Sequence, residues 1–345
     1  MAQINSSTSI FNPAWRRVWS SLSVLTCLLL LVEGGLRLLP EPFPSRTIQE
    51  LIPEMMTLPT PVIQVYGESV TYGAINDWVV ADAVGMSLEE LRNDAVPSTC
   101  AFFAYPLLKR QIQKGIVPKV IVLGYVSRSY CVSMVPKFLS HVATLGDMAE
   151  TAFILQPPLD PFLQGIMGRV SFAYRYRAEY NDLLRERFSS DGLATFTLPT
   201  TSLLERQRGL PRVLAEAAAD QNASQAEAMV RFFDIAFAPP AELERSLDLF
   251  LALAREHGIR VLLVSMPKPA SMKASHEASG FDQAYDRFMD RMTQHEHVSW
   301  LVREQASLPA SDFMDGVHLT RAAGFRFSQD LGQKLKAYLE KHPLE

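Results

Sequence analysis

The sequence has few cysteines and none of the spacings that bind zinc. Three cysteines occur in 345 residues, Cys27, Cys100 and Cys131, and no two of them form a CxxC pair. This pattern disfavours a structural zinc site and a disulfide-rich scaffold. We expect no metal and no organic cofactor. Cys100 and Cys131 could form one disulfide in an oxidising compartment or remain two buried thiols, and both alternatives stay open.

Clusters of lysine and arginine that could follow a phosphate backbone are also absent. With a formal net charge of -4, binding to nucleic acid is disfavoured. No internal repeat is found, and no low-complexity tract is long enough to indicate disorder. At this length the chain can bury a full core, which favours one large globular domain or two ordinary ones.

One long apolar run is present, close to the N-terminus. The segment Trp15-Arg16-Arg17 precedes an uncharged run from Val18 to Val32, and further leucines extend it to Leu39. Counted to that point, the run is long enough for a spanning helix, which requires about 20 apolar residues. The basic residues before it predict a cytoplasmic segment at 1–17, a transmembrane anchor at 18–39 and an extracytoplasmic remainder.

Three other interpretations of this run compete with a membrane anchor. A cleaved signal peptide needs a small-x-small site, and Glu33-Gly34-Gly35-Leu36-Arg37 is a poor one. A lipoprotein signal would use Cys27, but the apolar run continues past it. A helix buried in a soluble core is the third. We expect a single-pass membrane protein in contact with the lipid bilayer, with a proline-rich linker at 40–60 and a folded domain at 61–345.

Three short runs rich in valine, isoleucine and leucine follow the linker. They cover 62–66, 119–125 and 260–266, and a strand covered on both faces requires such a continuous apolar pattern. Helical patterns at 102–112 and 240–257 precede the last two runs. Alternating helix and strand predicts an α/β fold, a three-layer sandwich whose mostly parallel central sheet has helices on both faces.

Three further segments complete the expected domain. A short apolar segment at 298–302 is a candidate strand, and the last helix is expected from about 321 to 339. Between about 136 and 238 the pattern becomes mostly helical and rich in charge. This insertion is expected to cap the site, to serve as a docking surface, or simply to cover the sheet.

Two short motifs carry most of the chemical information. Gly67-Glu68-Ser69 follows the first strand, and Asp315-Gly316-Val317-His318 precedes the last helix. Nucleophiles in open parallel sheets lie at the carboxyl ends of strands, where Ser69 is placed. Residues three apart can face the same way, so Asp315 can orient His318 to accept the serine proton. Each motif alone is weak, but together they predict acyl transfer through a serine ester.

Two further residues are expected near the edge of the sheet that carries the serine. We expect the Glu68 side chain to point away from Ser69 and to hydrogen-bond with nearby backbone. His276 follows the third strand in what we expect to be a loop, and is a candidate for contact with substrate. A solvated loop histidine is the alternative.

The two motifs resemble those of the SGNH hydrolases, the GDSL-type esterase superfamily. That family carries Gly-Asp-Ser in its first block and Asp-x-x-His in its last; 67–69 matches with glutamate in place of aspartate, and 315–318 matches in full. The resemblance spans about 62–340 and implies an SGNH, flavodoxin-like fold. It is greatest to membrane-anchored members that act on cell-envelope polymers, often beside membrane-bound O-acyltransferases.

The resemblance implies a function and a set of site residues. The function is that of an extracytoplasmic serine esterase or O-acyltransferase acting on acyl esters, such as acetyl esters, of a cell-envelope polysaccharide. Its partner would be a membrane-bound acyltransferase or polysaccharide machinery. Ser69 would be the nucleophile, His318 the base and Asp315 the group that orients the base.

Two other blocks depart from the family pattern. The glycine of the second block, which donates an N–H to the oxyanion hole, is replaced within 96–99, so Ser98 or Thr99 would have to donate. The asparagine of the third block is missing from 124–129, so Ser127 or Arg128 would take its place. Loss of one donor can slow a reaction about 100- to 1000-fold. The alternative function is a catalytically degenerate SGNH-like module that binds a polymer or a membrane acyltransferase.

Overall fold

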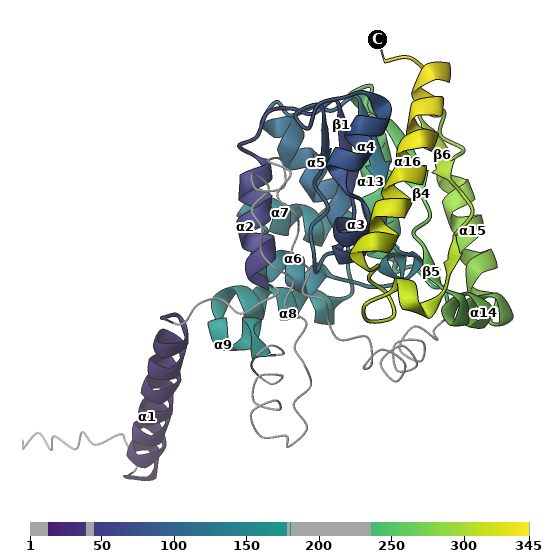
Figure 1. The fold of residues 1–345 in the computed structure, drawn as a ribbon. Helices are drawn as coiled ribbons and strands as arrows, with labels where there is room; N and C mark the ends of the chain where they lie inside the picture. Colours follow the sequence, from purple (N-terminus) through teal and green to yellow (C-terminus); the bar gives the residue numbers. More distant parts are fainter. Residues whose placement is uncertain (1–12, 39–44, 178–179, 181–235, 345) are drawn as a thin grey trace, which may run out of the picture.

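The computed structural model describes residues 13–38, 45–177, 180 and 236–344 (Figure 1). At its centre is a five-stranded sheet in the order β2-β1-β3-β4-β6, in which every neighbouring pair is parallel. This order corresponds to the flavodoxin-like arrangement 2-1-3-4-5. The strands are β1 (Ile63–Tyr66), β2 (Leu91–Asn93), β3 (Val120–Leu123), β4 (Arg260–Val264) and β6 (Val298–Val302). The predicted α/β fold with a mostly parallel sheet is confirmed.

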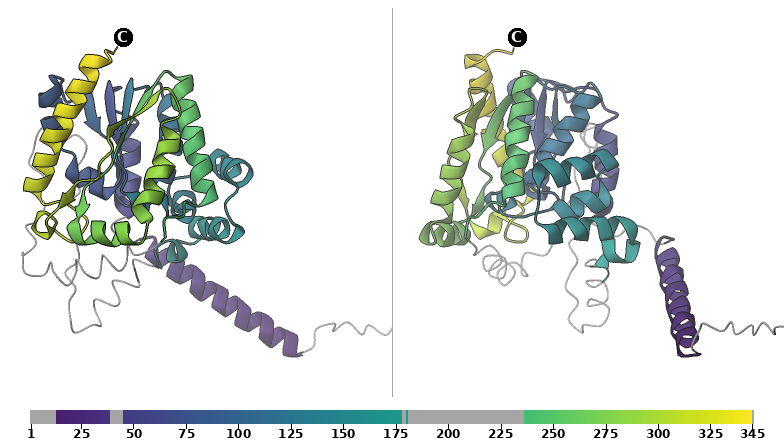
Figure 2. Two further views of the ribbon diagram at one scale, coloured as in Figure 1. Left: turned by 90° about the vertical axis from the view of Figure 1, so that its right-hand side faces the viewer. Right: turned by 180° about the vertical axis from the view of Figure 1, so that it is seen from behind.

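Side chains along the strands alternate between two apolar cores, because successive residues of a strand point to opposite faces. Val65 and Val122 belong to one core, whereas Tyr66 and Leu123 belong to the other. Helices cover both faces and complete the three layers (Figure 2). The first core includes α3 (Ser69–Ala74), α4 (Asp77–Val84) and α16 (Arg321–Lys341); the second includes α5 (Ala104–Gln113), α13 (Ala241–Glu256) and α15 (Phe281–Met292).

The four expected strands are all present in the central sheet, and the fifth strand of that sheet, β2, was not foreseen. β2 has only three residues and contains Arg92 and Asn93, so it lacks the apolar run used to recognise the others. Both polar side chains are buried: Arg92 forms an ion pair with Asp94 at 2.7 Å, and the Asn93 side-chain amide donates to the Ile75 carbonyl at 2.7 Å. These partners come from the tertiary fold, so a polar segment can occupy the edge of the sheet.

The linker predicted at 40–60 is wrong for much of its length. The helix α2 covers Ser45–Met55, with Pro53 in its last turn. Its side chains at positions 48, 51, 52 and 55 are buried in the same core as α5 and α13. That spacing places them on one helical face. The prolines on both sides of this segment are typical of a linker, although its apolar spacing is helical.

The insertion expected at about 136–238 is helical in the part that the structure describes. It comprises α6 (Val135–His141), α7 (Leu145–Glu150), a π-helical turn η3 (Thr151–Leu155), α8 (Leu159–Val170) and α9 (Phe172–Arg175). Residues 178–179 and 181–235 of the insertion lie outside the described residues.

The apolar N-terminal run forms α1 (Pro13–Leu36), which projects from the α/β domain (Figure 1). Within the described ranges, its segment Trp19–Leu36 is the one stretch long and apolar enough to cross a membrane, and none of it is buried. The alternative of a core helix is therefore wrong. A membrane anchor stays a prediction.

Candidate active site

The turn between β1 and α3 presents Ser69 as the first residue of α3. A Cβ atom on Gly67 would lie 2.3 Å from the Thr71 side chain, so only glycine fits here. The Thr71 hydroxyl donates to the carbonyl of Gly124, which follows β3. This contact joins the serine turn to the neighbouring strand end, as expected at the switch point of a parallel sheet.

Ser69, His318 and Asp315 form one hydrogen-bonded series. Ser69 Oγ lies 2.8 Å from His318 Nε2, although the two residues are 249 positions apart. His318 Nδ1 lies 2.7 Å from Asp315 Oδ2. When neutral His318 carries its proton on Nδ1, that N–H donates a hydrogen bond to Asp315. Nε2 is then left to accept the hydroxyl proton of Ser69. The structure thus brings together the three residues that the two motifs singled out.

The loop that carries Asp315 also stabilises the negative charge of its carboxylate. Asp315 Oδ1 accepts the backbone N–H groups of His318 at 2.9 Å and Val317 at 3.2 Å, and Gly316 adopts a φ of 86° that suits glycine. Burial raises the pKa of Asp315, but the hydrogen bonds from His318 and from the two N–H groups outweigh it and leave the pKa below its usual value. An ionised Asp315 can stabilise an imidazolium at position 318.

Glu68 points into the protein and not toward solvent. Its Oε1 accepts the N–H of Val126 at 3.1 Å, which confirms the predicted hydrogen bond with nearby backbone. Burial raises the pKa of Glu68 to about 8, although the Val126 N–H and the Ser129 hydroxyl oppose the shift. Glu68 therefore connects the serine turn to the segment that follows β3.

The segment at 96–99 lies beside the serine turn, because the Val96 N–H donates to the Gly67 carbonyl at 2.9 Å. Ser98 has a φ of 62°, in the left-handed region that favours glycine. The chain thus keeps a backbone conformation typical of glycine without the glycine. Thr99 is buried and its hydroxyl donates to the Val96 carbonyl at 2.7 Å.

Ser127 and Arg128 begin a 3₁₀ turn, η2 (Ser127–Tyr130), just after β3. Ser127 is buried and Arg128 is half-buried, and burial lowers the pKa of Arg128. The Val126 N–H donates to Glu68, and this contact places the turn next to the serine turn that follows β1. Their role as donors to an oxyanion stays a prediction, as does that of Ser98 and Thr99.

His276 does not lie in a solvated loop. It belongs to the helix α14 (Ala270–Ala278) and is 2% exposed. Its Nδ1 lies 3.1 Å from Lys268 Nζ, and its ring packs on Phe281 with centroids 4.1 Å apart. Lys268 also pairs with Asp282 at 2.5 Å. A side chain this deeply buried presents no surface to a substrate, so the prediction of substrate contact is wrong.

The buried Lys268–His276–Asp282 cluster was missed as a unit. Each residue type is common, and Asp282 is separated from the other two by the turn at Gly280, which starts α15 with a φ of 74°. No motif joins the three in the sequence. They meet because the strand β5 (Lys268–Pro269), α14 and α15 pack together, each contributing one of the three.

The possible disulfide is not formed. Cys100 and Cys131 are both free thiols, and Cys100 Sγ donates to the Val132 carbonyl at 3.5 Å. Burial raises the pKa of Cys100 to about 12, so this thiol is a poor nucleophile. The alternative of two thiols packed in the protein describes the pair, with Cys131 half-buried.

No family model and no curated protein matches this sequence. Two solved structures are similar in shape. A proposed acylhydrolase from Bacteroides fragilis NCTC 9343 is 12% identical, with 86% of this chain and 99% of that chain covered and a TM-score of 0.36. A proposed platelet activating factor from Streptococcus pneumoniae is 11% identical, with coverage of 93% and 98% and a TM-score of 0.34. Likenesses this distant carry no argument about activity.

Proposed function

We propose that this chain is an SGNH-type serine esterase or O-acyltransferase. The observation that carries the proposal is the continuous series from Asp315 through His318 to the Ser69 hydroxyl, with separations of 2.7 and 2.8 Å. A serine at the carboxyl end of a strand that is hydrogen-bonded to a histidine, which in turn contacts an aspartate, has the groups needed for nucleophilic catalysis.

The reaction proceeds through an acyl-serine. His318 Nε2 accepts the Ser69 proton as Oγ attacks the carbonyl carbon of an ester, and Asp315 stabilises the imidazolium. The tetrahedral intermediate collapses to acyl-serine, and the departing alcohol takes the proton from His318. Water or a sugar hydroxyl then gives its proton to His318 and attacks the acyl carbon. As this second tetrahedral intermediate collapses, Ser69 Oγ departs and takes the proton back from His318. The acyl group, acetyl in the simplest case, passes to that acceptor.

The proposed location is outside the cytoplasm, with α1 as a single-pass anchor. The exposed apolar segment Trp19–Leu36 and the arginines that precede it in the sequence support this orientation. The proposed acceptor is a cell-envelope polysaccharide, and the proposed partner is a membrane-bound acyltransferase that supplies or shares the acyl group.

Turnover of a small acetyl ester tests the catalytic proposal directly. Ser69→Ala removes the nucleophile and is expected to abolish turnover. Ser271→Ala, on an exposed position of α14, is the matched control and should leave the rate unchanged. Equal rates in the wild type and Ser69→Ala would remove Ser69 from the mechanism.

A non-catalytic binding module is the second candidate. It is favoured by Ser98 and by Ser127-Arg128, which stand where the family has glycine and asparagine. A fluorophosphonate probe separates the two, because it reacts with an activated serine. Labelling that is lost in Ser69→Ala supports the enzyme, and a wild type that does not label supports the binding module.

A further inference from the structure

The helix α8 exposes its large apolar side chains. Leu159, Leu163, Met167 and Val170 are between 50% and 71% exposed. Their spacing of four, four and three residues places them along one face of the helix. We call these four residues the α8 stripe. Soluble proteins rarely leave a contiguous apolar patch uncovered, so such a patch points to an interaction.

The opposite face of α8 is built from glycine. A Cβ on Gly165 would lie 2.6 Å from the Leu139 side chain, and one on Gly168 would lie 2.8 Å from that of Ser140. The helix α8 thus packs closely on α6 through its smallest residues. Phe162 of α8 also packs against the core, whereas the four residues of the stripe take no part in this contact. The stripe is not needed to hold α8 in place.

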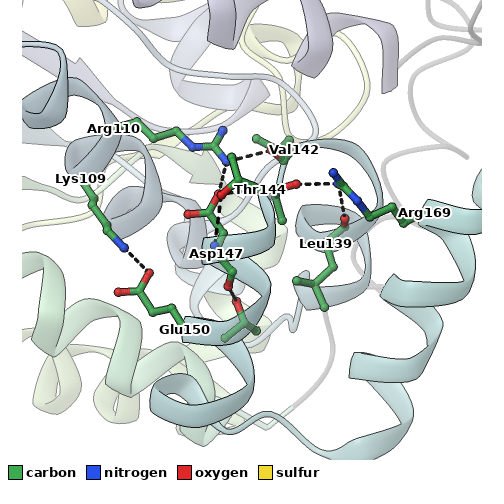
Figure 3. Close-up of polar contacts among 10 residues, drawn as sticks. Lys109, Arg110, Leu139, Val142, Thr144, Asp147, Glu150 and Arg169 are labelled. Atoms are coloured by element: carbon green, nitrogen blue, oxygen red, sulfur yellow. Dashed lines mark hydrogen bonds and ion pairs between the residues drawn. The ribbon is translucent and has the colours of Figure 1, made fainter.

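Polar contacts fix α8 and its neighbours to the α/β domain (Figure 3). Arg169 of α8 donates to the carbonyls of Ala143 at 2.5 Å and Leu139 at 3.4 Å. Arg110 of α5 pairs with Asp147 of α7 at 2.5 Å. These contacts hold the stripe in a defined orientation relative to the sheet.

The α8 stripe is continuous with the end of α1. Arg37 donates to the carbonyl of Val170, the last residue of the stripe, at 3.1 Å. Glu33 pairs with Arg37 at 2.9 Å and accepts the N–H of Ala173 at 3.1 Å. The candidate span of α1 ends at Leu36, so the stripe starts at the level where α1 would leave a bilayer.

The catalytic edge of the sheet faces the same way. In Figures 1 and 2, α8 and α9 lie at the end of the domain next to α1. The helix α16, which starts just after His318, begins at that end and runs to the C-terminus at the opposite end. The start of α16, and with it the loop that carries the Asp315–His318 pair, therefore lies on the side of the domain from which α1 projects.

We propose that the α8 stripe lies on the surface of the lipid bilayer and holds the active-site edge toward the membrane. The stripe enters the boundary between headgroups and acyl chains, as the apolar face of an interfacial helix does. An acyl group presented at the membrane surface can then reach Ser69. This inference rests on the anchor in the proposed function, and it does not require that the chain be catalytic.

Fluorescence quenching in vesicles tests the contact with lipid. The full-length chain with Cys131→Ala is reconstituted in phosphatidylcholine vesicles that contain nitroxide-labelled lipid, and an environment-sensitive fluorophore is attached to one cysteine. Cys27 reports on α1. With Cys27→Ala added, Leu163→Cys reports on the stripe, and Gln333→Cys, exposed on α16, is the control. Cys100 is buried and stays unlabelled.

Quenching at positions 27 and 163, on the order of twofold or more above that at 333, is the expected result. Leu159→Glu with Met167→Glu should reduce the quenching at 163. Quenching at 27 without selective quenching at 163 would overturn the inference, keep the anchor and leave a protein partner as the cover. No quenching at 27 would remove the anchor and the inference together. If position 163 is quenched but the protein turns over no ester, the contact of the α8 stripe with lipid is supported and the proposed reaction fails.

Discussion

Two histidines in this chain each lie next to a carboxylate, and they have opposite surroundings. His318 lies between Asp315 and the hydroxyl of Ser69, and its side chain is 14% exposed. His276 lies 3.5 Å from Asp282, but its other polar neighbour is Lys268, and its side chain is 3% exposed. The two pairs differ in the third residue that they contact. For His318 it is the nucleophile Ser69 after a strand end, and for His276 it is the buried cation Lys268.

Residue types alone therefore do not make an active site. Burial lowers the pKa of Lys268, against the attraction of Asp282, while burial raises the pKa of Asp282 and the hydrogen bonds from His276 and Lys268 bring it below its usual value. Such a buried polar cluster holds α14 and α15 in register. The Asp315–His318 pair is instead held by its own loop and directed at Ser69. We expect one pair to serve chemistry and the other stability.

Substitution of the two histidines should have the largest effects, on activity at His318 and on stability at His276. His318→Gln removes the base and should lower kcat on an acetyl ester on the order of 10⁶-fold. His276→Gln should leave kcat per folded molecule unchanged but lower the unfolding free energy by about 2 kcal/mol, because a buried ring and its polar contacts are lost. Ester turnover and urea denaturation of both variants check this. A large loss of kcat in His276→Gln would contradict the structural role.

Substitution of the two carboxylates should give the same contrast between activity and stability, with a smaller loss of activity than at His318. Asp315→Asn leaves the nucleophile and base in place and should slow turnover on the order of 10⁴-fold, since the favourable tautomer of His318 is lost. Asp282→Asn removes the charge that faces Lys268 and should cost about 3 kcal/mol of stability with little change in kcat. The same two assays apply. Equal rates in Asp315→Asn and the wild type would mean that Asp315 does not orient the base.

Glu68 is buried like His276, yet it is adjacent to the nucleophile. Its pKa of about 8 in the folded chain lies above the ordinary value of 4.5, so the folded state holds a proton that the unfolded state releases. Stability should therefore fall as pH rises from about 4.5 to 8 and stay level above that. Glu68→Gln should flatten this profile in denaturation from pH 5 to 8.5. Glu340→Gln, exposed on α16, should keep the wild-type profile.

The smallest expected effect is at Ser98, on the oxyanion side of the site. Its φ of 62° strains a non-glycine residue, so Ser98→Gly should gain about 1 kcal/mol of unfolding free energy. The backbone N–H is retained, and turnover should persist. Ser98→Ala keeps the strain and removes the hydroxyl, so it should gain no stability. A loss of turnover in both variants would assign the donor to the hydroxyl.

The strands were predictable where burial on both faces imposes a continuous apolar run, as in β1, β3 and β4. The edge strand β2 was not, because Arg92 and Asn93 depend on partners elsewhere in the chain. Nor was α2: its buried face fits helical spacing, but the prolines on both sides of it favoured a linker. In both places local sequence preference and tertiary contacts disagree, and the contacts prevail.

The sequence alone determined the chemistry available to this protein and one local geometry. Asp315 and His318 are three residues apart, and a short loop with a glycine at 316 is sufficient to join them. The steric demand for glycine at 67 is also local, since Thr71 is four residues away. Interactions this short in sequence require little of the rest of the chain.

Only the tertiary structure decided which histidine meets the serine. The 249 positions between Ser69 and His318 are spanned by the sheet, whose parallel strands bring their carboxyl ends to one edge. The same packing buries His276 and turns the α8 stripe outward, beside α1. Burial and orientation depend on the sum of many distant contacts, and for that reason no short motif encodes them.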